Sequence, residues 1–335
     1  MTQLTADVAG IGNAIVDVLA RADDAFVAKH GLHKGTMTLI DGQRAETLYA
    51  AMGSAREVSG GSAANTLAGV AALGGKGAFI GKVRNDQLGG IFRHDIEALG
   101  VAFDTPPATA GDPTARCLIF VTPDAQRTMN TYLGAAVSLG PGDVDPETVQ
   151  GAKVLYLEGY LFDPPAAQEA FVAAARLAHA VGRKVALSLS DPFCVTRHRE
   201  AFRILVEGHV DLLFANLVEA ETLTGAKGAE AAADALAGKA EVVVITQSEK
   251  GALVLSGSER HRVPAVPPRQ LVDSTGAGDL FAAGFLVGYT RGKALADCGR
   301  LGALAATECI EHFGARPERD LKALAAEHFG PHFLA

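Results

Sequence analysis

The chain has 335 residues, 48% of them hydrophobic, and a formal net charge of −8 at pH 7. This length allows a sizeable core and, by length alone, two or three domains, while the acidic balance disfavours nucleic acid as a partner. The four cysteines (Cys117, Cys194, Cys298 and Cys309) form no Cys-x-x-Cys pair, so their spacing indicates neither a zinc knuckle nor a redox motif and fits a reducing compartment.

The N-terminal region does not have the pattern of a signal peptide, because Asp7, Asp17 and Arg21 interrupt its apolar residues. No uninterrupted apolar run reaches the length of a membrane span. We therefore expect a cytoplasmic protein that acts on small molecules, without a membrane or nucleic-acid partner.

Hydrophobic patterning predicts alternating strands and helices along the chain. In the first half we expect strands at residues 8–12, 36–40, 78–80, 115–122 and 127–133, the last two joined as a hairpin by residues 123–126, and helices at 67–73 and 88–99. From residue 150 onward we expect strands at 154–157, 185–189, 212–215 and 242–245 and helices at 166–181 and 229–237. Such apolar, β-branched strands alternating with helices predict an α/β fold with a mostly parallel sheet covered on both faces. Residues 14–40 and 114–133 have the pattern of two-faced antiparallel strands, so we expect one large α/β domain spanning 1–335 with a small β-sheet lid inserted as these two segments.

Polar side chains follow the first strand. The segment Gly10-Ile-Gly12-Asn13 superficially matches a dinucleotide-binding fingerprint, but Ile15 stands where the third glycine is needed. Asn13 and Asp17 are better interpreted as groups at the carboxyl end of a strand, where open sheets bind ligands. An amide and a carboxylate together suit a vicinal diol, although Asp17 on a solvated lid surface is the alternative.

A pair of glycines precedes the expected helix at 67–73. Gly60 and Gly61 would let a ligand approach the backbone, and Asn65 would direct its amide toward the same ligand from the first helical turn. A plain helix cap at Ser62 is the alternative.

Three further groups follow later strands or lie in the hairpin. Asn216 and Glu219 are three residues apart and share one helix face, although most such pairs are simply solvated. Thr246 follows the strand at 242–245, and with Ser248 and Gly251 it would cradle the phosphates of a nucleotide. Arg127, at the hairpin, is a candidate phosphate clamp or an ordinary exposed arginine.

The most informative segment is 273–279, which runs into the apolar stretch 280–286. The backbone amides of Gly276, Ala277 and Gly278 at a helix N-terminus form a favourable site for an anion. Asp279 beside it would accept a proton from a hydroxyl that attacks a bound phosphoryl group. A common turn followed by an ordinary capping aspartate is the alternative for the Gly-Ala-Gly-Asp tetrapeptide alone.

The 273–285 block resembles the C-terminal signature of the ribokinase-like carbohydrate and purine kinases of the PfkB type, and 59–65 resembles the N-terminal signature. The resemblance covers essentially the whole chain, because the motifs occur in the family's order. It implies ATP and Mg²⁺ as cofactors, Asp279 as catalytic base, and an anion hole formed by the Gly276, Ala277 and Gly278 amides. It also implies that Asn216 and Glu219 organise Mg²⁺ and its waters, and that Asp273 and Thr275 hold a monovalent cation such as K⁺. The family usually has glycine where Ser248 stands, which makes backbone contact there less certain.

Segments 12–17, 32–37 and 128–133 resemble the adenosine-phosphorylating members of this family more than its ribokinases or fructokinases. We therefore expect transfer to the 5′-hydroxyl of adenosine, with Asn13, Asp17, Gly61 and Asn65 on the diol. Cys117 and Met129 would line the purine edge, and Tyr132, Tyr160 and Phe162 are candidates for stacking. A sugar kinase is the main alternative, and a nucleoside-binding protein without turnover or a dinucleotide oxidoreductase are remote ones. Either a monomer or a homodimer is compatible with the sequence.

Overall fold

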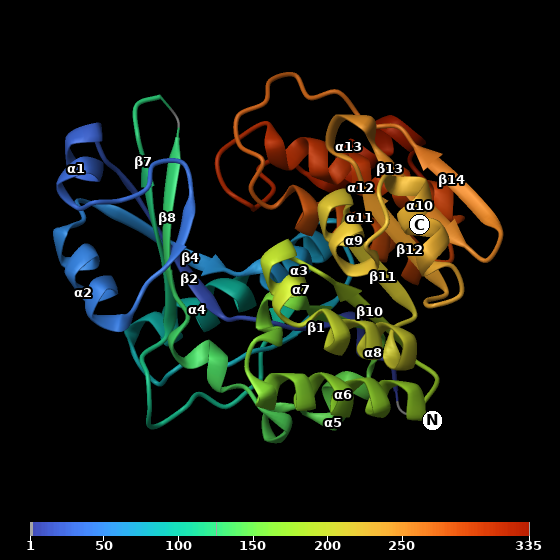
Figure 1. Cartoon of the computed structure of the whole chain (residues 1–335), viewed down its shortest axis with the longest axis horizontal. Coiled ribbons are helices and arrows are strands. Elements are labelled where there is room, and N and C mark those ends of the chain that lie inside the picture. The colour runs from blue at the N-terminus through green and yellow to red at the C-terminus, as the bar shows by residue number, and fades with distance from the viewer. Residues whose placement is uncertain (1–2, 125, 335) are drawn as a thin grey trace.

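A computed structural model describes residues 3–124 and 126–334 and shows a large α/β body joined to a smaller β-sheet layer (Figure 1). Within these residues the larger sheet has nine strands in the order β14-β13-β12-β11-β10-β9-β1-β5-β6. In chain order they are β1 (Ala6–Ile11), β5 (Gly77–Ile80), β6 (Val101–Ala102), β9 (Ala152–Glu158), β10 (Lys184–Ser188), β11 (Leu212–Asn216), β12 (Val242–Thr246), β13 (Ala252–Ser256) and β14 (Glu259–Val263). Neighbouring strands from β12 to β6 are parallel, whereas β13 and β14 pair antiparallel at one edge. The predicted mostly parallel sheet is confirmed.

Helices cover both faces of this sheet because successive strand residues point to opposite sides. In β9, Val154 and Tyr156 join one buried cluster, and Leu155 and Leu157 join the other. The first cluster includes residues of α3 (Ser62–Ala72), α11 (Ala277–Thr290), α12 (Leu295–Ile310) and α13 (Leu321–Phe329). The second includes residues of α5 (Pro146–Gln150), α6 (Pro165–Ala180), α7 (Pro192–Arg197), α8 (Arg199–His209), α9 (Leu217–Thr224) and α10 (Ala229–Leu236). Among the helices described, none is both long and apolar enough to cross a membrane.

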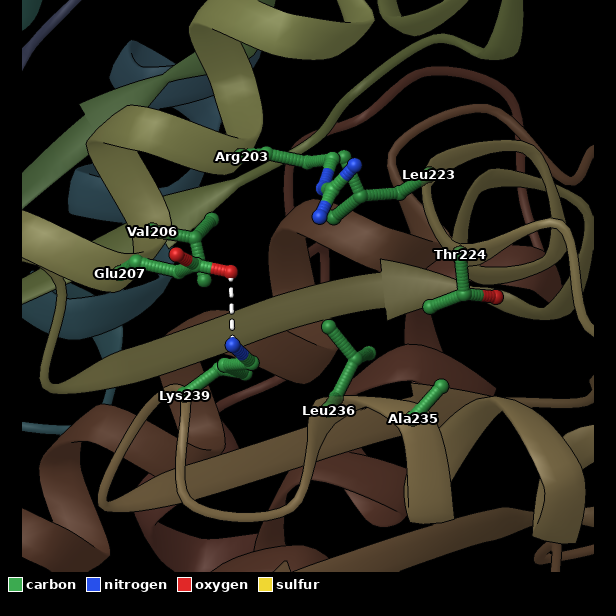
Figure 2. A pocket seen from close by; sticks show the side chains of 8 residues that line it. All are labelled: Arg203, Val206, Glu207, Leu223, Thr224, Ala235, Leu236 and Lys239. Carbon is green, nitrogen blue, oxygen red and sulfur yellow. Dashed lines mark ion pairs between the residues drawn. The ribbon is translucent and has the colours of Figure 1, made fainter.

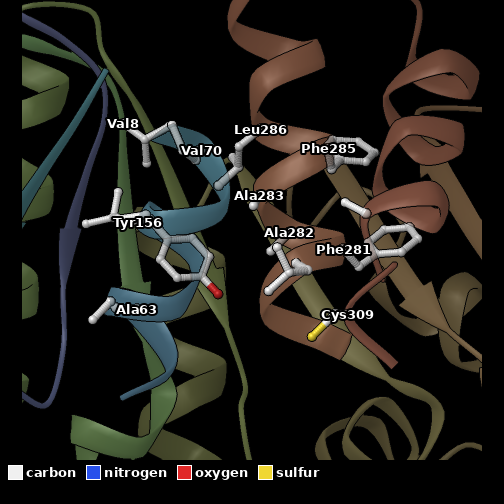
Figure 3. Close-up of a cluster of buried hydrophobic side chains, with 14 of the residues drawn as sticks. Val8, Ala63, Val70, Tyr156, Phe281, Ala282, Ala283, Phe285, Leu286 and Cys309 are labelled. Carbon is white, nitrogen blue, oxygen red and sulfur yellow. The ribbon is translucent and has the colours of Figure 1, made fainter. Parts of the chain in front are cut away.

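Helix α11 is buried along most of its length. Residues 280–288 are all buried, and Figure 3 shows Ala283 and Leu286 of this helix on its side toward α3, beside which Tyr156 lies. Gly284 lies on the opposite side, against the backbone of Leu301 and Gly302 in α12. Burying each large apolar side chain contributes about 1.5–3 kcal/mol. This packing therefore fixes the helix whose N-terminus carries the predicted anion site.

The smaller sheet has five strands among the residues described, in the order β3-β8-β7-β2-β4. They are β2 (Ile15–Arg21), β3 (Met37–Leu39), β4 (Ala55–Gly60), β7 (Ala115–Val121) and β8 (Arg127–Tyr132), backed by α1 (Asp24–Lys29), α2 (Gly42–Ala51) and α4 (Gln87–Ala98). The β7–β8 hairpin occurs as predicted, with Val121 opposite Arg127, although residue 125 of its turn lies outside the described residues.

Two expectations for this sheet were wrong. A third segment, β4, contributes a strand that the sequence did not reveal, because exposed charged residues such as Arg56 leave it without a clear apolar alternation. The sheet is also mixed rather than antiparallel, since β2 pairs parallel with β7 and β3 pairs parallel with β8. Parallel pairing is possible here because a long stretch of chain separates the two strands of each pair.

Candidate functional site

A pocket of about 700 Å³ lies between the two sheets, a volume suited to a small molecule. It collects groups from the carboxyl ends of β1, β9, β10, β11 and β12, from the N-terminus of α11 and from one face of the small sheet. Its lining includes most of the predicted site residues: Asn13, Asp17, Gly61, Asn65, Cys117, Met129, Asn216, Glu219, Thr246, Thr275, Gly276, Gly278 and Asp279. The predicted residues Gly60, Arg127, Ser248, Gly251, Asp273 and Ala277 do not line it.

A smaller cavity of about 250 Å³ lies among α8, α9 and α10 (Figure 2). Its walls combine aliphatic side chains with an ion pair in which Lys239 Nζ lies 2.8 Å from Glu207 Oε1. None of the sequence motifs contributes to it, so the larger pocket is the candidate site.

One wall of the large pocket is largely apolar, with Asp17 and Thr131 as polar members. It is formed by the face of the small sheet that carries Ile15, Met37, Leu39, Cys117, Ile119, Met129 and Leu133. These residues alternate along their strands, and the intervening side chains point to the other face. Tyr132 is one of the latter: its ring lies against Gly42, on the side of the sheet away from the pocket.

This arrangement corrects the expected stacking residues. Tyr132 faces away from the pocket, and Phe162 is buried in the core against Phe171 and Phe202. Only Tyr160 of the three proposed aromatic residues lines the cavity. The broad apolar surface is therefore aliphatic and thioether in character.

Asp279 occupies the first turn of α11 and is partly buried. Its carboxylate accepts hydrogen bonds from Ser62 Oγ at 2.6 Å and from Asn65 Nδ2 at 3.0 Å. Burial raises the pKa of Asp279 from 3.8 to about 6, against the opposing effect of these bonds and of the Arg316 charge. Asp279 is thus a carboxylate whose proton affinity is unusually high for an aspartate.

The loop before α11 turns sharply at Gly276, where φ is 80°. A side chain there would be strained and would also meet Ala315, whose Cβ lies 2.5 Å from the position of an added Cβ. The Ala277 amide donates to Ser274 O at 3.3 Å and Ala277 does not line the pocket. Its predicted place among the anion-binding amides is therefore weaker than that of Gly278, which lines the pocket within the first helical turn, where amides lack helical partners.

Asn13 follows β1 and is held by the buried carboxylate of Glu158 at the end of β9. Glu158 Oε1 accepts from Asn13 Nδ2 at 2.7 Å and from the Asn13 amide at 3.2 Å, while Oε2 accepts from the Ala63 amide at 2.7 Å. Burial raises the pKa of Glu158 to about 7. Gly61 closes this corner with φ of 95°, and a Cβ there would lie 2.2 Å from the Asn13 carbonyl oxygen. Glycine is therefore required at that position.

Asp17 directs a partly buried carboxylate into the pocket from β2. Gly60 stands beside it without a side chain, and an added Cβ would lie 2.5 Å from the carboxylate. No hydrogen bond to the Asp17 carboxylate occurs within the described part of the chain. Burial raises the pKa of Asp17 to about 6, opposed by the charges of Arg316 and Arg127. A partly buried carboxylate without a donor from the protein suits a ligand hydroxyl.

Asn216 and Glu219 form a capping box at the start of α9. The Glu219 amide donates to Asn216 Oδ1 at 2.9 Å, and Glu219 Oε2 accepts from the Asn216 amide at 2.9 Å. Burial, together with the nearby charges of Asp191 and Asp279, raises the pKa of Glu219 to about 7 against the opposing hydrogen bond from the Asn216 amide. Carboxylates that repel one another in this way fit a divalent cation shared with phosphate oxygens. A cage of three or more His, Cys, Asp or Glu ligands does not occur in the residues described.

The β12 end presents Thr246 to the pocket, but the following residues serve the turn. Gly251 (φ 85°) receives the Gln247 amide on its carbonyl at 2.7 Å, and a Cβ there would lie 2.0 Å from Val263 O. Ser248 has φ of 53°, a left-handed conformation that is uncommon for residues other than glycine. This conformation explains why glycine would be favoured at that position. Neither Ser248 nor Gly251 lines the pocket.

Arg127 pairs with Asp273 instead of facing the pocket. The Arg127 Nη1 to Asp273 Oδ2 distance is 2.8 Å, and both side chains are less than 10% exposed. Asp273 also accepts from the Thr275 amide and hydroxyl and from the Gly314 amide. A guanidinium and three donors already surround this carboxylate, so these side chains as arranged do not fit the expected monovalent cation.

The sequence did not reveal three contributing residues. Ser62 had been considered only as a cap, although its hydroxyl contacts Asp279. Glu158 is the last residue of a buried strand, as Asn216 is, so a polar residue at a strand end was the signal that could have revealed it. Arg316 lies in the loop after α12, where no pattern marked it.

The sequence and the fold are both similar to those of known proteins. Residues 35–321 match the pfkB family of carbohydrate kinases. The chain is 53% identical to the crystal structure of an adenosine kinase from Sinorhizobium meliloti, which covers 96% of this chain and 99% of that one with a TM-score of 0.88. It is 52% identical to the structure of a probable sugar kinase from Rhizobium etli CFN 42, over 98% and 99% of the two chains with a TM-score of 0.89. It is also 26% identical to the adenosine kinase of Saccharomyces cerevisiae (strain ATCC 204508 / S288c), over 93% of this chain and 96% of that protein.

The fold is therefore ribokinase-like. Kinases of this family use ATP, typically with Mg²⁺. The chain belongs to the pfkB family of carbohydrate kinases and is a sugar or nucleoside kinase, a phosphotransferase that acts on a hydroxyl group.

Proposed function

We propose that the protein transfers the γ-phosphoryl group of ATP to the 5′-hydroxyl of a nucleoside, with adenosine as the preferred acceptor. The observation that carries the proposal is the juxtaposition, in one pocket, of the apolar face of the small sheet with the carboxylates of Asp17 and Asp279. A free sugar has polar groups on both faces and would leave that apolar wall unused. A nucleoside has an apolar base and a polar ribose, which matches the two walls.

In this arrangement the ribose lies over Asn13, Asp17 and Gly61. Asp17 accepts hydrogen bonds from the two ring hydroxyls, since its carboxylate has the acceptor capacity for both. Glu158 accepts from the Asn13 amide groups and so fixes how Asn13 is presented. The base then lies along Met37, Cys117 and Met129, where thioether and aliphatic contacts replace aromatic stacking.

The 5′-hydroxyl is then directed at Asp279. Its oxygen attacks the γ-phosphorus, its proton passes to the Asp279 carboxylate, and the bond to the β,γ-bridging oxygen breaks to release ADP. With a pKa of about 6, Asp279 is ionised at neutral pH and yet a better base than an ordinary aspartate. The amides at Gly276 and Gly278 would stabilise charge on the transferring group.

The nucleotide side of the pocket is formed by the ends of β11 and β12. Glu219 is the residue that would hold Mg²⁺ through water, and Thr246 would contact the phosphates. When bound, Mg²⁺ neutralises charge on the phosphate oxygens. The buried Glu219 carboxylate, whose pKa is raised by burial, would gain a cation that favours its ionised form.

Direct competition tests the acceptor. Adenosine, ribose and fructose are incubated together with the enzyme, ATP and Mg²⁺, and the phosphorylated products are separated by mass. We expect adenosine to exceed both sugars by at least about 100-fold in kcat/KM, because base contacts are worth roughly 1–3 kcal/mol and polar contacts at the base edge add to them. Equal use of ribose or fructose would replace this proposal with a sugar kinase, and binding of adenosine without any product would indicate a binding protein.

A pair of small-sheet variants shows whether the apolar face is responsible. Met129→Ala removes a side chain from the pocket face, whereas Tyr132→Ala removes a larger one from the opposite face of the same strand. We expect M129A to raise the KM for adenosine by about tenfold and Y132A to leave it near the wild-type value. The reverse ranking would place the base elsewhere.

A further inference from the structure

Arg316 is a partly buried residue that does not line the pocket and lies outside the motifs that identify the family. It donates to Ala64 O at 2.7 Å, to Ser59 O at 2.6 Å and to Ser59 Oγ at 3.0 Å. These three acceptors are neutral, and no carboxylate within the described residues forms a contact ion pair with it. A guanidinium that is partly removed from water and bonded only to neutral oxygens has no counter-charge in contact, so its charge can act on carboxylates nearby.

Hydrogen bonds and packing fix the loop on both sides of Arg316. On one side, the Gly314 amide donates to Asp273, and Ala315 packs on Gly276 of the anion-site turn. On the other, Glu308 of α12 accepts from the amides of Glu318 at 3.0 Å and Arg319 at 2.8 Å. The backbone contacts of the loop and the hydrogen bonds of the side chain therefore hold the guanidinium in place.

Three carboxylates on three different elements interact electrostatically with Arg316: Asp17 from β2, Asp95 from α4 and Asp279 from α11. Asp95 is already engaged, because Asp95 Oδ2 accepts from the Ser59 amide at 2.8 Å and from its hydroxyl at 2.6 Å. Asp17 and Asp279 are the two that open into the pocket. Arg127 also acts on Asp17 but is paired with Asp273, so Arg316 is the cation without a partner of its own.

We propose that Arg316 is a positioning residue whose fixed charge keeps both Asp17 and Asp279 ionised while its hydrogen bonds hold the β4–α3 connection that contacts them. It reaches the acceptor and the phosphoryl group only through these two carboxylates. The inference rests on the proposed function of Asp17 and Asp279, and it adds a residue from the C-terminal loop to that machinery. In this proposal the Arg316 loop connects the turn at Gly276, on which Ala315 packs, with the β4–α3 connection at Gly61.

The pH dependence of kcat and of kcat/KM tests the proposal with two substitutions, Arg316→Gln and Arg316→Lys. Loss of the cation in R316Q should move the acidic limb of activity upward by about one pH unit and raise the acceptor KM more than the ATP KM. R316K keeps the charge, so its limb should stay close to that of the wild type even if kcat falls. Arg291→Gln is the matched control, because Arg291 also donates to backbone carbonyls, those of Leu73 and Gly74, away from the pocket.

A purely structural role would lower activity in R316Q and R316K alike with the wild-type pH profile, and that result would overturn the proposal. If R316Q does not fold, the double variant Asp17→Asn with Arg316→Gln removes a facing carboxylate together with the cation. Its kcat limb, compared with that of Asp17→Asn alone, still reports on Asp279, and an unmoved limb would again refute the inference. These pH profiles are measured with whichever acceptor the wild-type enzyme phosphorylates. If adenosine is not that acceptor, the competition assay shows it before the Arg316 variants are tested.

Discussion

Replacing Asp279 by asparagine should abolish turnover and stabilise the fold at the same time. Burial raises the pKa of this carboxyl from 3.8 to about 6, and each pH unit corresponds to about 1.4 kcal/mol. The ionised carboxylate therefore costs roughly 3 kcal/mol of unfolding free energy above pH 6. Asparagine keeps one of the two accepted hydrogen bonds and forfeits about 1 kcal/mol for the other, which leaves a net gain of about 2 kcal/mol near pH 8.

The sign of the pH dependence follows from the raised pKa. Below pH 3.8 the carboxyl is protonated in both the folded and the unfolded chain, so it carries no penalty there. The penalty grows as pH rises from 3.8 to the folded-state pKa of about 6 and then levels off, so the stability gap between D279N and wild type should widen by about 1 kcal/mol or more between about pH 5 and about pH 8.

Urea unfolding followed by circular dichroism at several pH values measures this gap, and Asp104→Asn, at an exposed aspartate, is the control. Turnover of D279N should fall about 10³-fold or more, with nucleotide binding retained. A stability gap that is absent or independent of pH would refute the burial argument. Turnover above about a tenth of the wild-type value would show that Asp279 is not the base.

Two other substitutions probe the acceptor corner and the Arg127–Asp273 pair. Asp17→Ala should weaken acceptor binding by about 100-fold and ATP binding hardly at all, because hydrogen bonds to a charged group contribute about 1.5–3 kcal/mol; calorimetry that finds the loss on ATP would reassign the residue. Replacing tetramethylammonium by potassium should change wild-type turnover by less than about twofold, since Arg127 already neutralises Asp273. Arg127→Gln should make turnover depend on potassium, and a strong potassium requirement in the wild type would contradict the arrangement described.

Much of the fold and the centre of the site followed from local patterns in the sequence. Strand ends in a parallel sheet meet at one edge, which is why Asn13, Asn216 and Thr246 come together even though they are far apart in the chain. The Gly-Ala-Gly-Asp turn was recognisable because glycine is needed where φ is positive, as at Gly276.

What could not be predicted depends on register and on distant contacts. Tyr132 seemed suited to stack on a base, but its strand presents Met129 and Thr131 to the pocket and turns Tyr132 to the other face. Arg127 was a candidate phosphate clamp or an exposed hairpin arginine, yet its side chain pairs with Asp273, which lies 146 residues away along the chain. Arg316 has no sequence signal because its proposed role depends on Asp17 and Asp279, which come from two separate elements.

The division of the pocket between two sheets has an evolutionary consequence. The side chains that would choose the acceptor base project from strands β2, β3, β7 and β8, while those that would move the phosphoryl group stand on the large sheet and α11. Substitutions at Met37, Ile119 or Met129 can thus reshape acceptor selection without disturbing the hydrogen bonds around Asp279. Related enzymes could therefore evolve specificity for new acceptors through substitutions on the small sheet. The residues proposed for phosphoryl transfer would stay unchanged.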